Sequence, residues 1–171
     1  MNATNLFSPT LLAAAVLAFG VATDAHAVAL TRTDMQISTG LCDAVSPAQD
    51  TSLRRNATGI QNVSNTYVMI GCSMQGDFNS ATGLLSTYAY FRNPTAANVT
   101  VRCTLSAGSQ LLGFVNSSKS IVVAPGGLGA ISWSSPADFP AGNRFSNMSC
   151  YLPPSVVAGE IVTRYLENVG A

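Results

Sequence analysis

The regular alternation of polar and apolar side chains is the feature that most limits what this chain can fold into. It is clearest in residues 98–105, Asn-Val-Thr-Val-Arg-Cys-Thr-Leu. A period of two places alternate side chains on opposite faces of a β-strand, so one face can enter a core while the other meets water. No window has the 3.6-residue period of a convincing amphipathic helix; the best candidate, residues 53–62, offers a turn or two and is weakened by Gly59.

Runs of the same character recur along the chain. We expect further strands at 34–41, 65–73, 84–92, 110–116, 120–124, 128–134, 145–152 and 160–166. Clusters of Gly, Pro, Asn and Asp separate them. One cluster, Pro125-Gly126-Gly127, predicts a hairpin because glycine adopts the positive φ that tight turns need. About eight short strands at close spacing predict an all-β fold, an antiparallel sandwich or barrel.

Residues 1–27 have the form of a secretory signal peptide, although residues 1–10 lack the usual positive charge. The apolar run 11–19 has the length of a signal-peptide core and ends near Ala25-His26-Ala27, a small-x-small cleavage pattern. A membrane anchor is the rival interpretation, but residues 20–24 interrupt the run before the roughly 18 residues that a span needs. We therefore expect cleavage, export, no membrane span after cleavage, and one β-sandwich domain over residues 28–171.

Four well-separated cysteines predict a disulfide framework in an exported chain: Cys42, Cys72, Cys103 and Cys150. Zinc is the competing interpretation, but the chain has no CxxC pair and its one histidine lies in the signal. Of the three possible connectivities we favour Cys42–Cys72 with Cys103–Cys150, whose loops the chain-entropy model values at about 3.5–4 kcal/mol each. A Cys103–Cys150 bridge suggests a sandwich of immunoglobulin-like general architecture, with the disulfide joining the two sheets.

Several segments around the cysteines carry a recognisable pattern: Gly40-Leu-Cys42, Gly71-Cys72, Phe91-Arg-Asn-Pro94, residues 98–105, Ser149-Cys-Tyr-Leu-Pro-Pro154, and Ile161 with Tyr165 near the end. Together they resemble a loose group of small exported bacterial proteins of unknown function. The resemblance covers most of the mature chain. It implies a disulfide-bonded β-sandwich in the periplasm or outside a Gram-negative bacterium, and it carries no catalytic residues.

The composition excludes several classes of function. Once Asp24 leaves with the signal, eight basic residues face seven acidic ones, so the net charge of about +1 gives no electrostatic case for nucleic acid or an anionic membrane. The mature chain has no histidine, and we expect no free thiol, which removes the usual nucleophile–base pairs. We see no cofactor motif and no internal repeat. Lys119, between Ser118 and Ser120, is typical of a polar turn rather than a Ser–Lys site.

The acidic residues show no spacing that points to chemistry. The mature chain has seven: Asp34, Asp43, Asp50, Asp77, Asp138, Glu160 and Glu167. A glycan hydrolase needs two carboxylates about 5 to 10 Å apart, but most of these acids fall where turns are expected. Asp77 and Asp138 lack the DxDxDG spacing of a calcium loop. We therefore predict no metal site and no catalytic residue.

The strand predicted at 84–92 carries the most suggestive surface feature. Tyr88, Tyr90 and Arg92 share one face, and Leu85, Thr87, Ala89 and Phe91 share the other. If the second set enters the core, the first becomes an exposed ladder suited to a sugar, a peptide or another protein. The alternative is ordinary cross-strand packing of the tyrosines with wet hydroxyl groups. Trp133 follows Ile131 on one strand face and is predicted to lie in the core.

These features lead to three functional hypotheses. The first is a non-enzymatic exported β-sandwich that acts as a surface binding or envelope-associated module, with Tyr88, Tyr90 and Arg92 as its binding face and a protein or glycan as its ligand. The second is a fimbrial or coat subunit that assembles by strand addition through residues 28–37. The third, ranked lowest, is a small carboxylate-dependent glycan hydrolase.

Overall fold

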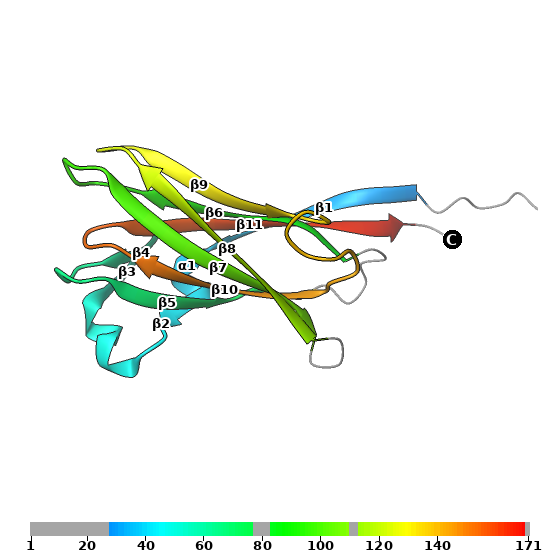
Figure 1. The fold of residues 1–171 in the computed structure, drawn as a ribbon, viewed down its shortest axis with the longest axis horizontal. Helices are drawn as coiled ribbons and strands as arrows, with labels where there is room; N and C mark the ends of the chain where they lie inside the picture. The colour runs from blue at the N-terminus through cyan, green and yellow to red at the C-terminus, as the bar shows by residue number, and fades with distance from the viewer. Residues whose placement is uncertain (1–27, 77–82, 110–112, 170–171) are drawn as a thin grey trace, which may run out of the picture.

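The computed structural model describes residues 28–76, 83–109 and 113–169, and the expected signal peptide lies outside them. Two antiparallel β-sheets face each other across one hydrophobic core (Figure 1), so the predicted all-β sandwich is confirmed. The described residues form eleven strands rather than about eight, because several segments that read as turns pair over only three or four residues.

We name the two layers sheet A and sheet B. Sheet A consists of β1 (Val28–Ile37), β3 (Leu53–Asn56), β4 (Gly59–Asn62), β6 (Leu84–Arg92), β9 (Leu128–Ser134) and β11 (Val157–Val169). Its order is β3-β4-β11-β6-β9, and β1 pairs with β11. Sheet B consists of β2 (Cys42–Ala44), β5 (Val68–Ser73), β7 (Val99–Ser109), β8 (Gly113–Val123) and β10 (Phe145–Leu152), in the order β2-β5-β10-β7-β8.

Three local predictions differ from the structure. Residues 53–62, where at most a turn or two of helix was expected, form the β3–β4 hairpin. Gly59 has φ +148° and lies against the Ala158 carbonyl group, a close approach that only glycine allows. The end of the strand expected at 34–41 is instead a helical turn, α1 (Ser38–Leu41), and a 3-10 helix, η1 (Pro47–Ser52), follows β2. The two strands expected around 110–124 are one strand, β8.

The hairpin predicted at Pro125-Gly126-Gly127 is wrong. The turn is present, and Gly126 has the expected positive φ of 66°. It leads from β8 in sheet B to β9 in sheet A, so the strands it connects are not hydrogen-bonded neighbours. A local glycine turn has the same sequence signature whether the chain returns along the same sheet or crosses to the other one.

The core between the sheets contains the side chains that strand alternation predicted. In β7, Val101, Cys103 and Leu105 are buried. Trp133 on β9 is fully buried, which confirms it as a core residue, and its indole N–H donates to the Ser117 carbonyl oxygen at 2.9 Å. A buried indole stabilises the core only if its polar atom finds such a partner.

Both favoured disulfides are confirmed, but their expected role is not. Cys42–Cys72 joins β2 to β5, and Cys103–Cys150 joins β7 to β10. In each pair the cysteines lie directly opposite one another on adjacent strands of sheet B. The prediction that Cys103–Cys150 joins the two sheets is therefore wrong, because side chains opposite each other on neighbouring strands point to the same face and bridge within the sheet.

Two buried asparagines at one end of the sandwich connect the two sheets instead. Asn62 ends β4, and Asn93 follows β6, each where the chain crosses from sheet A to sheet B. The Asn62 side-chain amide donates to the Thr66 carbonyl at 2.7 Å and to the Leu152 carbonyl of sheet B at 2.9 Å. Its side-chain oxygen accepts from the Ser64 N–H and hydroxyl groups at 2.9 and 2.8 Å.

The second corner repeats the first. The Asn93 amide donates to the Ala97 and Val123 carbonyls at 2.7 and 2.9 Å, and its oxygen accepts from the Thr95 N–H and hydroxyl groups. The turns that cross back, Pro154-Ser155 and Pro125-Gly126, both place their second residue at φ 66°. The two corners and their return turns thus repeat one local structure, which the sequence does not display because the shared residues are few and scattered.

Candidate binding groove

The outer face of sheet A carries the predicted binding residues. Thr87, Ala89 and Phe91 of β6 are buried, as expected, while Leu85 is half-buried. The opposite side chains of β6 therefore point away from sheet B. Tyr90 and Arg92 are exposed there, and the Tyr90 side chain is 39% accessible.

Tyr88 differs from the other two members of the predicted face. Arg164 of β11 covers its ring, with the guanidinium carbon 5.4 Å from the ring centroid. Val162 lies directly across from it in the sheet. Tyr88 is therefore packed by its cross-strand neighbours, as the alternative interpretation predicted, and its ring face is occupied by a cation–π contact.

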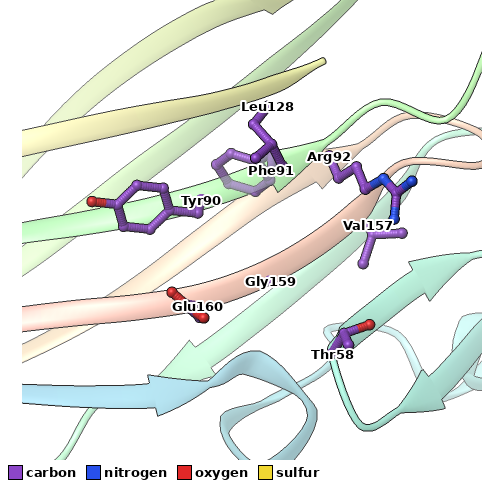
Figure 2. A pocket seen from close by; sticks show the side chains of 8 residues that line it. All are labelled: Thr58, Tyr90, Phe91, Arg92, Leu128, Val157, Gly159 and Glu160. Atoms are coloured by element: carbon purple, nitrogen blue, oxygen red, sulfur yellow. The ribbon is translucent and has the colours of Figure 1, made fainter. Parts of the chain in front are cut away.

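A groove of about 270 Å³ lies next to Tyr90. The pairing of β11 with β6 is irregular between Ala158 and Ile161, which places Gly159 and Glu160 in a bulge. Three strands, β6, β9 and β11, and the β3–β4 turn form the groove, four elements in all. Figure 2 labels its lining residues: Thr58, Tyr90, Phe91, Arg92, Leu128, Val157, Gly159 and Glu160. The depression therefore runs across the strands, and no single strand forms it.

The groove combines an aromatic ring with two opposite charges. Figure 2 shows Glu160 on the Tyr90 side of the groove and Arg92 on the Val157 side. Within residues 28–76, 83–109 and 113–169, Arg92 and Glu160 take part in no ion pair or side-chain hydrogen bond with each other or with another residue. Their hydrogen-bonding groups are therefore available to a ligand that enters the groove.

Most of the groove residues were not predicted. Leu128, Val157 and Glu160 come from β9 and β11, and Thr58 comes from the β3–β4 turn. Glu160 was classified only as one of seven surface acids. No local signal could have identified these residues, because they meet β6 through strand pairing between distant parts of the chain.

A second depression, of about 380 Å³, lies on the outer face of sheet B. Small polar side chains dominate it, among them Ser73, Asn147 and Ser149, and none of its described lining residues is aromatic. Asp43, the one charged residue among them, already pairs with Arg55. The groove on sheet A is thus the better candidate site, since it offers both an apolar surface and unsatisfied charged groups.

The remaining acidic residues are engaged in ion pairs. Five of the six acids in the described part contact basic side chains: Asp34 and Glu167 contact Arg32, Asp43 and Asp50 contact Arg55, and Asp138 contacts Lys119. Glu160 is the sixth. Asp77 lies outside the described residues. In that same part of the chain, no three His, Cys, Asp or Glu side chains are placed to hold a metal ion together.

Lys119 lies within strand β8 and not in the polar turn expected there, and its side chain links β8 to β9 and to the turn that follows β9. Its ammonium group donates to Asp138 at 2.7 Å and to the Ser132 carbonyl oxygen at 2.8 Å. Burial of Asp138 opposes its ionisation, but hydrogen bonds from Lys119 and from the Ser134 N–H outweigh that effect and hold the pKa of this carboxyl group below its usual value. Ser118 precedes Lys119 on β8 and points to the other face of the strand, so the two do not form a nucleophile–base pair.

No protein-family model and no curated protein matches this chain. Among solved structures, it is similar to an exo-β-1,3-galactanase from Phanerochaete chrysosporium, with 7% identity and a TM-score of 0.47 over 77% of this chain, which spans 29% of that enzyme. It is also similar to a family 11 carbohydrate-binding module from Clostridium thermocellum, with 13% identity and a TM-score of 0.35 over 90% of this chain and 92% of the module.

A third similar structure is a pilus protein of Bacillus endospore appendages, described as disulfide-linked, with 14% identity and a TM-score of 0.33 over 96% of this chain and all of that one. Similarity this low leaves the ligand and the activity to be inferred from the site itself. Two features bear on location: the paired cysteines indicate an oxidising environment, and the described residues contain no helix long and apolar enough to cross a membrane.

Proposed function

We propose that this protein is an exported, non-enzymatic binding module that holds a carbohydrate in the groove on the outer face of sheet A. One observation carries the proposal: an exposed aromatic ring, Tyr90, shares a concave site with two charged side chains that have no partner among the described residues, Arg92 and Glu160. Export to the periplasm or beyond is supported by the disulfides and by the resemblance to small exported bacterial proteins.

The chemistry of the groove suits a sugar. A tyrosine ring offers a flat apolar surface for the C–H face of a pyranose, together with a polar hydroxyl group. A guanidinium group presents several donors in a fixed fork, and a carboxylate accepts from two directions, so both can bind neighbouring hydroxyl groups. The volume of about 270 Å³ is just below the range of roughly 300–1,000 Å³ typical of small-molecule sites.

The charge of the groove favours a neutral ligand. Arg92 and Glu160 cancel in formal charge, so neither an acidic nor a basic ligand gains net attraction there. A ligand that displaces water from Arg92 and Glu160 must replace the hydrogen bonds of both groups to offset the free-energy cost of desolvating them. A polyhydroxylated sugar has donors and acceptors for each. A peptide, whose backbone has one donor and one acceptor per residue, satisfies fewer of them.

The proposal excludes catalysis at this groove. Hydrolysis by the common glycosidase mechanisms uses two carboxyl groups about 5 to 10 Å apart. Of the residues that the structure describes, Glu160 is the one carboxylate that lines the groove. The strand-adding subunit is also disfavoured, because β1 would have to leave ten paired positions along β11 to serve as a donor strand.

Affinity electrophoresis in gels that contain soluble neutral polysaccharides tests the proposal. We expect one of them to retard the protein, and Tyr90→Ala to weaken that binding at least tenfold, as truncation of an aromatic anchor does. Tyr151→Ala is the matched control, because Tyr151 is 49% accessible on the outer face of sheet B. Equal retardation of both variants, or retardation by no polysaccharide, would refute the proposal.

A further inference from the structure

β1 is a long strand at the edge of sheet A. It pairs with β11 over ten positions, and among the described residues no strand pairs with its other edge. Past the Tyr165–Leu84 pair and the hydrogen bond from the Leu166 N–H to the Gly83 carbonyl oxygen, β1 is the only described strand that pairs with β11. Among the described residues, 28–30 and 167–169 therefore form a two-stranded ribbon. Figure 1 shows this ribbon projecting past the rest of the sandwich. A two-stranded ribbon is only marginally stable in water, and proteins usually shorten, bulge or cover such an edge.

Apolar side chains are exposed along the same strand. Leu30, Met35 and Ile37 are 54%, 64% and 45% accessible. Met35 and Ile37 point to the outer face of the sheet, as Thr31 and Thr33 do, while Leu30 points to the opposite face. An edge with large exposed apolar side chains on both of its faces gains from pairing with another strand.

The order of the charged residues along β1 makes two antiparallel copies of this strand electrostatically complementary. Arg32 and Asp34 flank Thr33 and point to one face. When a second copy pairs antiparallel with its axis at Thr33, Arg32 lies opposite Asp34 of the partner subunit, and the reverse pair forms as well. Opposite charges directly across a strand pair are stabilising. Within one subunit Arg32 also contacts Asp34, Glu167 and the ring of Tyr165.

The same charges exclude the neighbouring registers. Moving the twofold axis by one residue slides one strand by two residues along the other, which keeps side chains that lie opposite each other on the same face. A shift in one direction places Arg32 against Arg32 of the partner subunit, and a shift in the other places Asp34 against Asp34 of the partner subunit. Like charges in directly opposite positions are destabilising. Of these three registers, only the one centred on Thr33 places Arg32 and Asp34 each opposite a residue of unlike charge.

We propose that the protein forms a symmetric dimer by antiparallel pairing of β1 with β1 of a second copy, centred on Thr33. The contact joins the two A sheets into one continuous sheet. Because the same edge is used by both copies, the interface is closed and does not propagate into a filament. None of the groove residues belongs to β1, so dimer formation and the proposed carbohydrate binding are tested independently.

Sedimentation equilibrium of the protein and of charge variants tests the dimer. We expect the wild-type chain to be dimeric, and both Arg32→Asp and Asp34→Arg to raise the dimer dissociation constant at least tenfold, since each creates two like-charge pairs across the axis. Mixing the two variants restores complementarity, so a heterodimer is expected, as is a homodimer of the double exchange. Arg102→Asp is the matched control: it makes the same charge change on an exposed position of β7 and should leave the constant unchanged.

Thr33→Glu covers the case in which the first variants fold poorly. Thr33 lies opposite Arg164 of the same chain, so a glutamate at position 33 is attracted to Arg164 within one subunit. In the dimer, however, the two glutamates at position 33 lie directly opposite each other across the axis and repel. We expect this variant to melt as the wild type does and to be monomeric. A monomeric wild-type protein, open-ended oligomers, or no heterodimer on mixing the folded single variants would each overturn the proposal.

Discussion

Replacing Asn62 by Asp tests whether the asparagine corners hold the two sheets together. Asn62 is fully buried, and its amide nitrogen donates to the carbonyl oxygens of Thr66 and Leu152. The substitution keeps the number of non-hydrogen atoms in the side chain, but it replaces the NH2 donor by an oxygen that faces two other oxygens. A protonated carboxyl group can serve only one of them, and an ionised one serves neither.

The expected magnitude follows from the two lost hydrogen bonds. Leaving a buried polar group without its partner costs about 1–3 kcal/mol, so we expect Asn62→Asp to lower the free energy of unfolding by about 3–4 kcal/mol. A change in unfolding free energy of this size is typical of substitutions that break a buried hydrogen-bond network. For a domain of this size the loss corresponds to a decrease in melting temperature of roughly 10 °C. Urea titration followed by circular dichroism, with the disulfides intact, measures it directly.

The chain contains a matched control for this substitution. Asn56 forms a similar local turn in which its side-chain oxygen accepts from the Thr58 N–H and hydroxyl groups at 3.0 and 2.8 Å, but it is exposed. A carboxylate keeps both of these acceptor contacts, so Asn56→Asp should change stability by less than about 0.5 kcal/mol. Asn93→Asp should match Asn62→Asp, because the second corner repeats the first. Equal small effects at all three positions would refute the role of the amide donors.

Three further substitutions test other features of the fold by the same titration. Ser155→Gly should stabilise the protein by about 0.5–1 kcal/mol, because Ser155 has φ 66° where the equivalent turn has glycine; a loss of stability would contradict the repeat. Gly59→Ala should destabilise it by more than about 1 kcal/mol, since a Cβ there meets a backbone carbonyl oxygen, and unchanged stability would contradict that contact. Asp138→Asn should cost about 1–2 kcal/mol near neutral pH through loss of the Lys119 ion pair. Because the pKa of Asp138 is lowered in the folded state, this stabilisation is fully present above the unfolded pKa of about 3.8 and is lost as the pH falls through the folded pKa. The difference in unfolding free energy between wild type and Asp138→Asn should therefore disappear in acid. A difference that persists there would contradict the role of the ionised carboxylate.

The candidate site shows how far sequence reasoning extends. The alternation in residues 84–92 correctly separated Thr87, Ala89 and Phe91 from the outward side chains, because the period of two is a local property of an extended backbone. It could not show that Arg164 covers Tyr88 or that Glu160 lies beside Tyr90. Those neighbours come from another strand, more than sixty residues along the chain by sequence number.

The sequence by itself determined the β class of the fold, the buried face of its clearest strands and the identity of the disulfide partners. These follow from side-chain periodicity and from the number and spacing of cysteines. Only the tertiary structure decided which strands are neighbours: it placed both disulfides within sheet B, turned the expected hairpin at residues 125–127 into a crossing between sheets, and assembled the groove from four elements. The physical reason is that strand pairing is non-local, since order and register are set by the simultaneous burial of all the apolar faces, and no single segment records that outcome.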